Sequence, residues 1–593
     1  MGGQSHWRAL LGLITPHRKR LSVMIGVLAI AGALPLLGPL LIASFIDEAE
    51  AGAVRSELIT IAGIYVGVGI ARQILSIAVA WTATDLSWRV TNELRSRLTR
   101  HVLNLDLAFH RSTSPGELVS RVDGDVTALS DFIASFAVKA AAATVTLMGL
   151  VVVLLVRDWQ VGLGLAVYLG LAISTMFLLR NKAVDEAATE QAATGRMLGE
   201  VEERLTGADD LRSNGGGSHA VATFQKASAA VLRSALGREK QGVTLWVISN
   251  AVFVIGGLIA LAVDVALLRR GSITLGTAYL IFQYTQILRA PLSALSDETE
   301  RVQRAAGGMA RTLQLLNEES FIKNTGTSRL PDGPLSLTFD QVSFTYGDED
   351  TPVPVIDDLD LTLQAGTSIG VLGRSGSGKT TMARLLLRLV EPTQGTVRLG
   401  GVALGDVPLA DLRARTGVVS QDVHLFGATI RDNLTLFDET ITDERVRNAL
   451  AELDLLSWVE AMSDGLDTEL GPAGDGLSAG EGQLIALTRL FLRSPDFVLL
   501  DEASSRIDPL TEQRVTRAID RLLQGRTSLV IAHRLSTVER LDEILILDAG
   551  KIAERGPTTD LRNDPTSQYS HMLAVGADVP LDHVAVPVTG NPA

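Results

Sequence analysis

Six long apolar stretches dominate the first half of the chain, separated by polar segments of very different length. The stretches are Leu21–Ile46, Leu58–Thr82, Phe132–Val156, Val161–Leu179, Val243–Leu268 and Ile273–Leu295. A bilayer core about 30 Å thick is crossed by about 20 helical residues, because a helix satisfies its own backbone polar groups. The pattern therefore predicts six membrane-spanning helices, within a transmembrane domain over residues 21–316.

Four of these stretches contain one charged residue each. These residues are Arg72, Lys139, Asp264 and Arg289. A charge inside a span is costly, so it suggests a place on a substrate path, with Arg72 and Arg289 near a cavity and Asp264 near the outer end. Such side chains also reach an interface or pair structurally. Both interpretations stay open.

The distribution of Lys and Arg predicts the orientation of the spans. The segments before the first span and after the second and fourth spans hold 19 of these residues, and the three opposite loops hold 4. Positive loops favour the cytosolic side, although Arg269 and Arg270 lie on the opposite side. We therefore expect the N-terminus and everything after the sixth span to be cytosolic. Residues 1–20 are interpreted as an interfacial helix.

The two long inner segments, Asp85–Asp131 and Arg180–Lys240, show helical periodicity, as in Leu86–Leu105. A helix that runs out and back over such a length reaches about 35 Å beyond the bilayer. Pro and Gly residues interrupt the periodicity near Phe109–Leu118 and Gly207–Gly217. The pattern predicts helical extensions that turn at these two places and contact a cytosolic domain.

The second half of the chain has a different pattern. Residues 317–334 are polar and rich in Gly and Pro, which is typical of a linker. Over residues 335–575, short β-rich runs alternate with helical ones, which predicts an α/β domain with a largely parallel sheet. Residues 576–593 lack any periodicity and are expected to be disordered.

Composition excludes several classes of protein. The chain has 593 residues, 46% of them hydrophobic, and a net charge of −14 without a basic tail, which argues against nucleic acid as a partner. Cysteine is absent, so a disulfide, a thiol nucleophile or a Cys-ligated zinc is impossible. Of the 53 basic residues, 45 are Arg, which suggests a GC-rich bacterial source.

The motif GRSGSGKT, followed by Thr381, predicts a nucleotide-triphosphate site. Its glycines let backbone N–H groups surround phosphates, and the helix that follows adds its positive end. Lysine at its position in the motif reaches the β- and γ-phosphates, and the next hydroxyl ligates Mg²⁺. The expected cofactors are ATP and Mg²⁺, bound by Gly373, Arg374, Ser375, Gly376, Ser377, Gly378, Lys379, Thr380 and Thr381.

A second motif, FVLLDE at Phe497–Glu502, completes this site. A buried strand brings Asp501 to the Mg²⁺ and Glu502 to the attacking water. An apolar run that ends in Asp-Glu is usually structural when it stands alone. Its place after the phosphate-binding motif makes the catalytic interpretation specific.

The order of the motifs resembles that of the ATP-binding cassette (ABC) superfamily. Between the two motifs lies LSAGE, Leu477–Glu481, which is similar to the family's signature loop LSGGQ. The stretch Phe109–Phe132 is similar to the first intracellular loop of exporter-type members. The resemblance covers nearly the whole chain and implies an all-α six-helix transmembrane domain with long cytosolic helical extensions, followed by an α/β P-loop ATP-binding cassette.

The resemblance also implies roles for residues outside the two motifs. Tyr346 stacks on adenine, Gln421 contacts Mg²⁺ and the lytic water, and His533 contacts the γ-phosphate. Asp508 is the D-loop residue. Each has a structural alternative: a strand aromatic for Tyr346, a surface amide for Gln421 and a core histidine for His533.

One cassette and six spans imply a half-transporter that pairs with a second chain. ATP on Lys379 of one cassette is then covered by Ser478 and Gly480 of the other. Ala479 and Glu481 depart from the usual signature loop, and Arg506 stands where a small D-loop residue is common. Altered signature loops occur in heterodimeric relatives, so a homodimer and a heterodimer both stay open.

The resemblance implies a multi-pass ATPase of the bacterial plasma membrane. We expect it to export a small amphipathic compound, a lipid or a peptide by alternating access. Two alternatives stay open: an importer of a metal chelate on the exporter-type fold, and an ATP-gated channel or regulatory membrane protein.

Overall fold

A computed structural model describes residues 8, 11–346, 354–421, 423–471, 474–501, 509–532 and 534–575. Within these ranges it describes the backbone alone at 137, 176–188, 245, 249, 296, 297, 299, 300, 509, 510 and 575. The chain forms two compact units. The helical unit comprises residues 1–104 and 113–318, and the cassette unit comprises residues 105–112 and 319–593.

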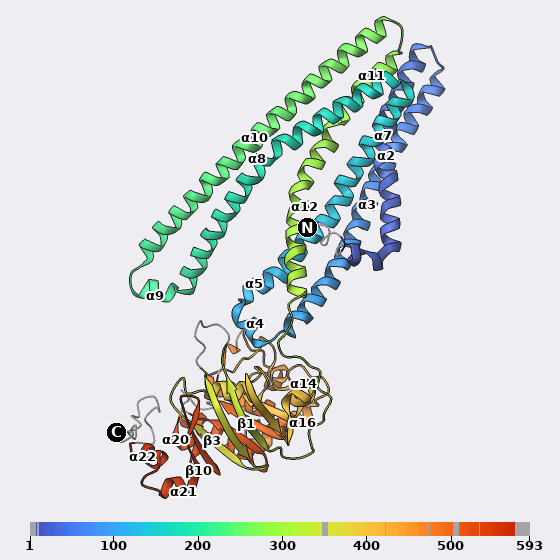
Figure 1. Ribbon diagram of the computed structural model, residues 1–593. Helices are drawn as coiled ribbons and strands as arrows, with labels where there is room; N and C mark the ends of the chain where they lie inside the picture. The colour runs from blue at the N-terminus through green and yellow to red at the C-terminus, as the bar shows by residue number, and fades with distance from the viewer. Residues whose placement is uncertain are drawn as a thin grey trace. The chain divides into compact units, whose positions relative to one another are not determined.

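The helical unit consists of long helices joined by short turns (Figure 1). Its elements are η1 (Thr15–His17), α2 (Arg18–Glu50), α3 (Arg55–Leu103), α5 (Pro115–Val119), η2 (Ser120–Gly124), α6 (Asp125–Ser135), η3 (Phe136–Ala141), α7 (Ala142–Arg157), α8 (Trp159–Thr206), α9 (Ala208–Ser213), α10 (Gly217–Arg269), α11 (Leu275–Ile287) and α12 (Arg289–Leu316).

Four helical stretches among the described residues are long and apolar enough to cross a membrane. They are Leu11–Glu50, Arg55–Leu103, Pro115–Arg157 and Gly217–Arg269, and Trp159–Thr175 is a shorter apolar helix. The stretch expected to form the sixth span is divided between α11 and α12, with a turn at Leu288. The number of six spans therefore stays a prediction.

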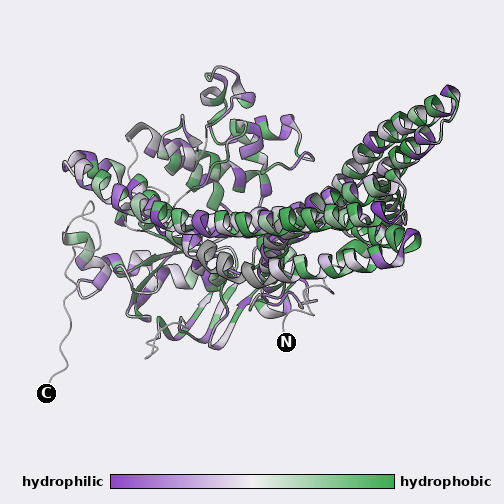
Figure 2. Cartoon of the chain, turned by 90° about the horizontal axis from the view of Figure 1, so that it is seen from above, coloured by the Kyte–Doolittle hydropathy of each residue, from purple (hydrophilic) through white to green (hydrophobic). Residues whose placement is uncertain are grey.

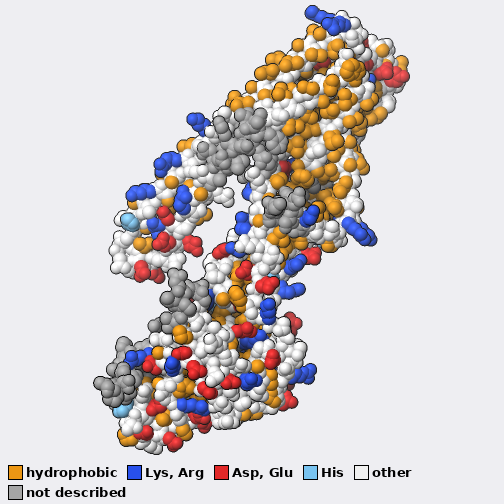
Figure 3. All heavy atoms as spheres, viewed as in Figure 1, with side chains coloured by type: hydrophobic (Ala, Val, Ile, Leu, Met, Phe, Trp, Pro, Cys, Tyr) orange, Lys and Arg blue, Asp and Glu red, His pale blue; other side chains and the backbone are white. Residues whose placement is uncertain are grey.

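The outer faces of these helices are apolar, as in a protein surrounded by lipid. Trp81 is 71% exposed, and Val156 is 82% exposed. Hydrophobic residues recur along the long helices in Figure 2 and cover much of the helical unit on the face shown in Figure 3. Exposed apolar surface of this extent marks an interaction site, here with a bilayer.

The helix over Pro115–Arg157 contains two π-helical segments, η2 and η3, on either side of α6. Two polar pairs hold α6 against α12. Arg311 Nε donates to Asp125 Oδ2 at 2.9 Å, and Ser135 Oγ donates to the buried Glu298 Oε2 at 2.7 Å. The pairs lie near opposite ends of α6, so α6 is fixed to α12 along its length.

Helices α8 and α10 run side by side and are joined through α9 (Figure 1). The short helix α9 lies in the segment predicted to turn, and Gly215 follows it with a φ of 72° that favours glycine. The other predicted turning segment overlaps the end of α4 (Leu107–Ser112) and the start of α5, which has Ser114 as N-cap and Pro115 in the first turn. The long helical extensions beyond the apolar stretches are thus confirmed.

The described residues of the cassette unit form two sheets. The first is antiparallel, with the strand order β2-β1-β4-β5. The second has the order β10-β9-β3-β8-β7-β6, and all its strands are parallel except β10. The strands are β1 (Leu337–Phe344), β2 (Ile356–Leu363), β3 (Ser368–Leu372), β4 (Gln394–Leu399), β5 (Val402–Ala403), β6 (Thr416–Val419), β7 (Phe497–Asp501), β8 (Thr527–Ile531), β9 (Glu543–Asp548) and β10 (Lys551–Pro557).

Helices and sheets of the cassette unit share two apolar cores. One core lies between the antiparallel sheet and α13, around Phe339 and Met382, and the other surrounds α18, around Leu484 and Leu500. The remaining elements are η4 (Leu404–Asp406), η5 (Gly465–Asp467), α13 (Lys379–Leu386), α14 (Leu409–Arg415), α15 (Ile430–Thr435), α16 (Asp443–Glu452), α17 (Leu456–Glu460), α18 (Ala479–Arg493), α19 (Pro509–Leu523), α20 (Leu535–Val538), α21 (Thr558–Asn563) and α22 (Gln568–Val575).

A helical domain followed by an α/β domain confirms the predicted fold class. The expected domain boundaries stay predictions, and the unit boundary at 318/319 falls inside the expected linker 317–334. The expected disordered tail, residues 576–593, lies outside the described residues.

Candidate nucleotide-binding site

The predicted nucleotide residues gather at one edge of the parallel sheet. The phosphate-binding motif follows β3, Asp501 ends β7, and Gln421 comes two residues after β6. Because β3, β8, β7 and β6 are neighbouring parallel strands, their carboxyl ends meet at the same edge. Ligands of open α/β sheets bind at this edge.

Glycine conformations shape the loop after β3. Gly373, Gly376 and Gly378 have φ values of 152°, 81° and 106°, which side-chain-bearing residues rarely adopt. A Cβ at Gly373 would overlap the backbone oxygen of Leu547, and one at Gly378 would lie 2.8 Å from Val355 O. A larger residue at either position would clash with these backbone oxygens, so the conformation of the loop depends on glycine.

Lys379 begins α13 and is enclosed by this loop. Its side chain is buried, and Nζ donates to Gly373 O at 2.5 Å and to Arg374 O at 3.0 Å. These hydrogen bonds hold the loop curved around the ammonium group. A buried cation among backbone N–H groups at a helix N-terminus suits a polyphosphate.

The hydroxyl and carboxylate groups around this loop fit a magnesium–nucleotide complex. Ser377 is buried, and its Oγ has no hydrogen-bond partner among the described residues. Thr380 is exposed in the first turn of α13, and Asp501 and Gln421 add oxygen donors at the same sheet edge. Oxygen donors, with phosphates and water, are the ligands that Mg²⁺ prefers.

Tyr346 lies near the phosphate loop, two residues after β1. Its Oη lies 3.2 Å from Thr381 Oγ1 and accepts a hydrogen bond from Arg384 Nη1 at 2.9 Å. Phe344 packs edge-on against its ring, with centroids 4.8 Å apart. Burial raises the pKa of Tyr346, but these hydrogen bonds and the charges of Arg384 and Arg111 lower it overall. The contacts fix the position of the ring beside α13 and the phosphate loop.

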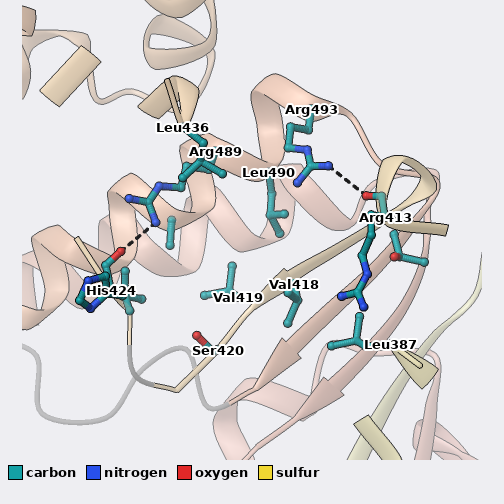
Figure 4. Close-up of a pocket in the computed structure, with 13 residues that line it drawn as sticks. Leu387, Arg413, Val418, Val419, Ser420, His424, Leu436, Arg489, Leu490 and Arg493 are labelled. Carbon is teal, nitrogen blue, oxygen red and sulfur yellow. Dashed lines mark hydrogen bonds between the residues drawn. The ribbon is translucent and has the colours of Figure 1, made fainter. Parts of the chain in front are cut away.

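A polar network supports the segment that follows Gln421. Arg489, on α18, donates to Asn433 O at 2.5 Å and to His424 O at 3.1 Å. Asn433 is fully buried and binds both backbone groups of Phe426. Burial lowers the pKa of Arg489. A cavity of about 260 Å³ lies beside this network, lined by β6 and α18 residues (Figure 4).

The predicted signature loop forms the start of α18. Ser478 is the N-cap: its Oγ accepts from Glu481 N, and Glu481 Oε2 accepts from Ser478 N at 2.8 Å, which completes a capping box. Ser478 is exposed and Gly480 is buried. The loop therefore presents a hydroxyl and a helix N-terminus at the surface of the cassette unit.

Three predicted site residues, Glu502, Asp508 and His533, lie outside the described residues. Two of their neighbours are described. Asp501 is the last residue of β7, and Ala532 directly follows β8, so both lie at the same sheet edge as the phosphate loop. The roles of these three residues stay predictions.

Sequence reasoning missed several residues that position this site. Arg384 and Arg111 contact Tyr346, and Arg489 supports the segment after Gln421. Arg384 and Arg489 belong to no short motif, whereas Arg111 lies within the stretch Phe109–Phe132 that resembles the family's first intracellular loop. Arg384 lies on the motif's own helix, which is the only signal that pointed to it.

Two protein families match the chain. The ABC transporter transmembrane region matches residues 21–292, and the ABC transporter family matches residues 356–505. An ATP-dependent lipid A-core flippase of Sodalis glossinidius is 30% identical over 569 residues, which cover 94% of this chain and 95% of the relative. The flippase of Chromobacterium violaceum is 29% identical over 564 residues, covering 93% and 94%.

Two further comparisons also find ABC proteins similar to this chain. An uncharacterised ABC transporter ATP-binding protein of Bacillus subtilis is 29% identical over 558 residues, covering 92% of this chain and 90% of the relative. The solved structure of a bacterial Atm1-family ABC exporter with ATP bound superposes with a TM-score of 0.81, at 24% identity, over 94% of this chain and 98% of that chain. This second likeness concerns the fold.

Proposed function

The chain belongs to the ABC transporter family and is an ATP-driven membrane transporter, and we propose that it exports a lipid or lipid-like amphiphile as one half of a dimer. The observation that supports the nucleotide site is the enclosed Lys379 within a loop of left-handed glycines. Tyr346, close to the same helix, supplies the ring for the base.

We assign the residues of the site to separate tasks. Lys379 neutralises the phosphates, and Tyr346 stacks on adenine. Thr380, Gln421 and Asp501 hold Mg²⁺, which neutralises developing charge on the phosphates when bound. Glu502 orients the water that attacks the γ-phosphate, and His533 contacts that phosphate. The oxygen donor set at the sheet edge supports this assignment.

The exposed start of α18 supports the proposed dimer. Ser478 is exposed at the N-terminus of α18, and the backbone N–H groups of a helix N-terminus favour anions. In a dimer, Ser478 and Gly480 of one chain cover the ATP that Lys379 of the other chain holds. Nucleotide then links the two chains, and hydrolysis releases them.

The proposed cargo follows from two observations. Two of the three relatives described above, at 29 and 30% identity, are named ATP-dependent lipid A-core flippases. The helical unit exposes large apolar side chains such as Trp81 and Val156, so a substrate with acyl chains reaches it from the bilayer. The excess of Lys and Arg in the inner segments supports a cytosolic cassette unit in the plasma membrane of a bacterium.

The test is translocation of a fluorescent lipid in proteoliposomes that contain the purified chain. With ATP and Mg²⁺, we expect the share of lipid protected from an external quencher to change, and chelation of Mg²⁺ with EDTA stops both this change and ATP hydrolysis. The Glu502→Gln variant should bind ATP, form a stable dimer and lose turnover. Undiminished hydrolysis in that variant would falsify the assignment of Glu502, and movement of lipid without ATP would contradict pumping.

A further inference from the structure

A short piece of the helical half of the sequence belongs to the cassette unit. Residues 105–112, which include α4, pack with residues 319–593, whereas the residues before and after them belong to the helical unit. The chain therefore passes between the two units at three places: 104/105, 112/113 and 318/319. Any movement transmitted along the chain must pass through these places.

The carboxylate of Asp106 connects the chain segments that follow two of these places, 104/105 and 318/319. Asp106 lies two residues beyond the first passage, and its Oδ2 accepts from Phe321 N at 2.7 Å and from Ser320 Oγ at 3.3 Å. Ser320 and Phe321 lie directly after the third passage. The contact thus connects segments 214 and 215 residues apart in sequence.

The other oxygen of Asp106 has a separate task. Oδ1 accepts from Phe109 N at 3.1 Å, which caps the start of α4. Asp106 is only 9% exposed, so these bonds are shielded from water. A buried carboxylate that receives three hydrogen bonds is held firmly, and each bond to a charged group is stronger than a neutral one.

The segment that Asp106 holds is attached to the cassette unit further along. Lys323 O accepts from Arg388 Nη2 at 2.9 Å, and Asn324 Oδ1 accepts from Leu409 N at 2.9 Å. The side chain of Phe321 is 82% exposed, so its backbone N–H makes the contact with Asp106. The residue type at 106 decides whether this connection exists.

The far end of α4 lies beside the proposed base-stacking residue. The guanidinium carbon of Arg111 lies over the ring of Tyr346, 5.9 Å from its centroid. Helix α4 therefore extends from the segment at Phe321 to the edge of the nucleotide site, all within the cassette unit.

We propose that Asp106 is a positioning residue that fastens the segment at 320–321 to α4, so that these chain passages move as one body when ATP binds. Without this connection, the cassette still binds and hydrolyses ATP, but the movement is transmitted incompletely to the helical unit. The inference rests on the proposed function, since it assumes that ATP acts at Tyr346 and Lys379.

Two variants separate this role from simple capping. In Asp106→Asn, the amide oxygen keeps the cap on Phe109 N–H while the amide nitrogen faces Phe321 N–H, so a donor meets a donor. Phe321→Pro removes that N–H and leaves Asp106 intact. Ser114→Ala is the control, because it removes the N-cap of the neighbouring α5 without touching this connection.

Because the chain contains no cysteine, spin labels can be placed at single introduced cysteines. Ala51→Cys and Ser272→Cys, introduced one at a time, mark the turn after α2 and the turn between α10 and α11. The experiment measures the distance between the equivalent labels of the two full-length chains of the proposed dimer in lipid nanodiscs, without nucleotide and with ATP, Mg²⁺ and vanadate. ATP affinity and ATP hydrolysis are measured on the same samples.

In the parent chain and in Ser114→Ala, we expect trapping to change the distance distribution. In Asp106→Asn and Phe321→Pro, we expect ATP affinity within about twofold of the parent, whereas the trapped population falls about tenfold, as for loss of one charged hydrogen bond. A normal distance change in either variant overturns the proposal, as does loss of ATP binding. A parent chain that fails to hydrolyse ATP refutes the proposed function itself, which distinguishes the two failures.

Discussion

Glu481 of the signature loop accepts a hydrogen bond from the indole Nε1 of Trp458 at 3.0 Å. Its second oxygen accepts from Ser478 N and Ser478 Oγ, at 2.8 and 2.9 Å. The carboxylate thus joins the start of α18 to α17. Glu481 stands where the family usually has glutamine, and both of its carboxylate oxygens accept hydrogen bonds that hold the start of α18.

Replacement of Glu481 tests this arrangement. Glu481→Ala removes the capping box and leaves the indole N–H without its acceptor, so we expect a loss of about 1–2 kcal/mol in unfolding free energy. Glu481→Gln has a single oxygen and should lose about half as much. Thermal unfolding of the full chain measures both. Glu460→Ala, at an exposed ion pair with Arg447, serves as control and should change stability little.

Tyr346 offers a matched pair of variants for base stacking. Tyr346→Phe keeps the ring but loses the hydroxyl contacts to Thr381 and Arg384, so ATP affinity should fall no more than about threefold. Tyr346→Ala removes the ring, and stacking is worth about 1–3 kcal/mol, so affinity should fall at least about fivefold. Titration with a fluorescent ATP analogue gives both values. Equal affinity in the two variants would place adenine elsewhere.

The ion pair between Arg311 and Asp125 should stabilise the contact of α12 with α6. Asp125 is 8% exposed, while the Arg311 side chain is 55% exposed, so the pair is only partly shielded. Arg311→Met leaves a buried carboxylate unpaired, and we expect a loss of about 1–3 kcal/mol. The exchange of both charges, Asp125→Arg with Arg311→Asp, should recover part of that loss in a thermal-unfolding double-mutant cycle. Additive effects of the two single changes would show that the pair contributes nothing.

Close packing of α2 against α11 depends on Gly276. Its N–H donates to Asp47 Oδ1 at 2.8 Å, and a Cβ there would overlap the backbone oxygen of Ala43. Gly276→Ala must therefore push the helices apart, at a cost of about 1–3 kcal/mol. Gly67→Ala, in α3, meets nothing within 4 Å and should leave the melting temperature in detergent unchanged or higher. A tolerated Gly276→Ala would contradict the close contact.

The phosphate loop was predictable because its chemistry is local. The residues that bind phosphate, which are the glycines, Lys379 and Thr380, lie within a few positions of one another, so their spacing alone indicates phosphate binding. Arg384, Trp458 and Arg489 contribute through the folded arrangement of separate helices, and no short pattern identifies them. The same holds for Asp106, whose partner Phe321 lies 215 residues away.

In the helical unit, the average hydropathy of an apolar stretch does not predict where a helix is interrupted. The apolar stretch Ile273–Leu295 predicts one continuous helix, whereas the structure has a turn at Leu288 between α11 and α12. Pro291 gives a physical reason, because it has no N–H to donate to the carbonyl of Ile287. The hydropathy of a stretch reflects its preference for lipid, but it does not indicate that one backbone N–H donor is missing.

The wide turns η2 and η3 shift the phase of the helix that contains them. Each π turn accommodates one residue more than an α turn, which rotates everything beyond it by about 100° relative to a regular helix. A single helical wheel drawn over Pro115–Arg157 would therefore assign lipid-facing and inward-facing positions wrongly on at least one side of α6. Scanning accessibility along this helix should reveal three successive stripes, offset from one another, instead of one.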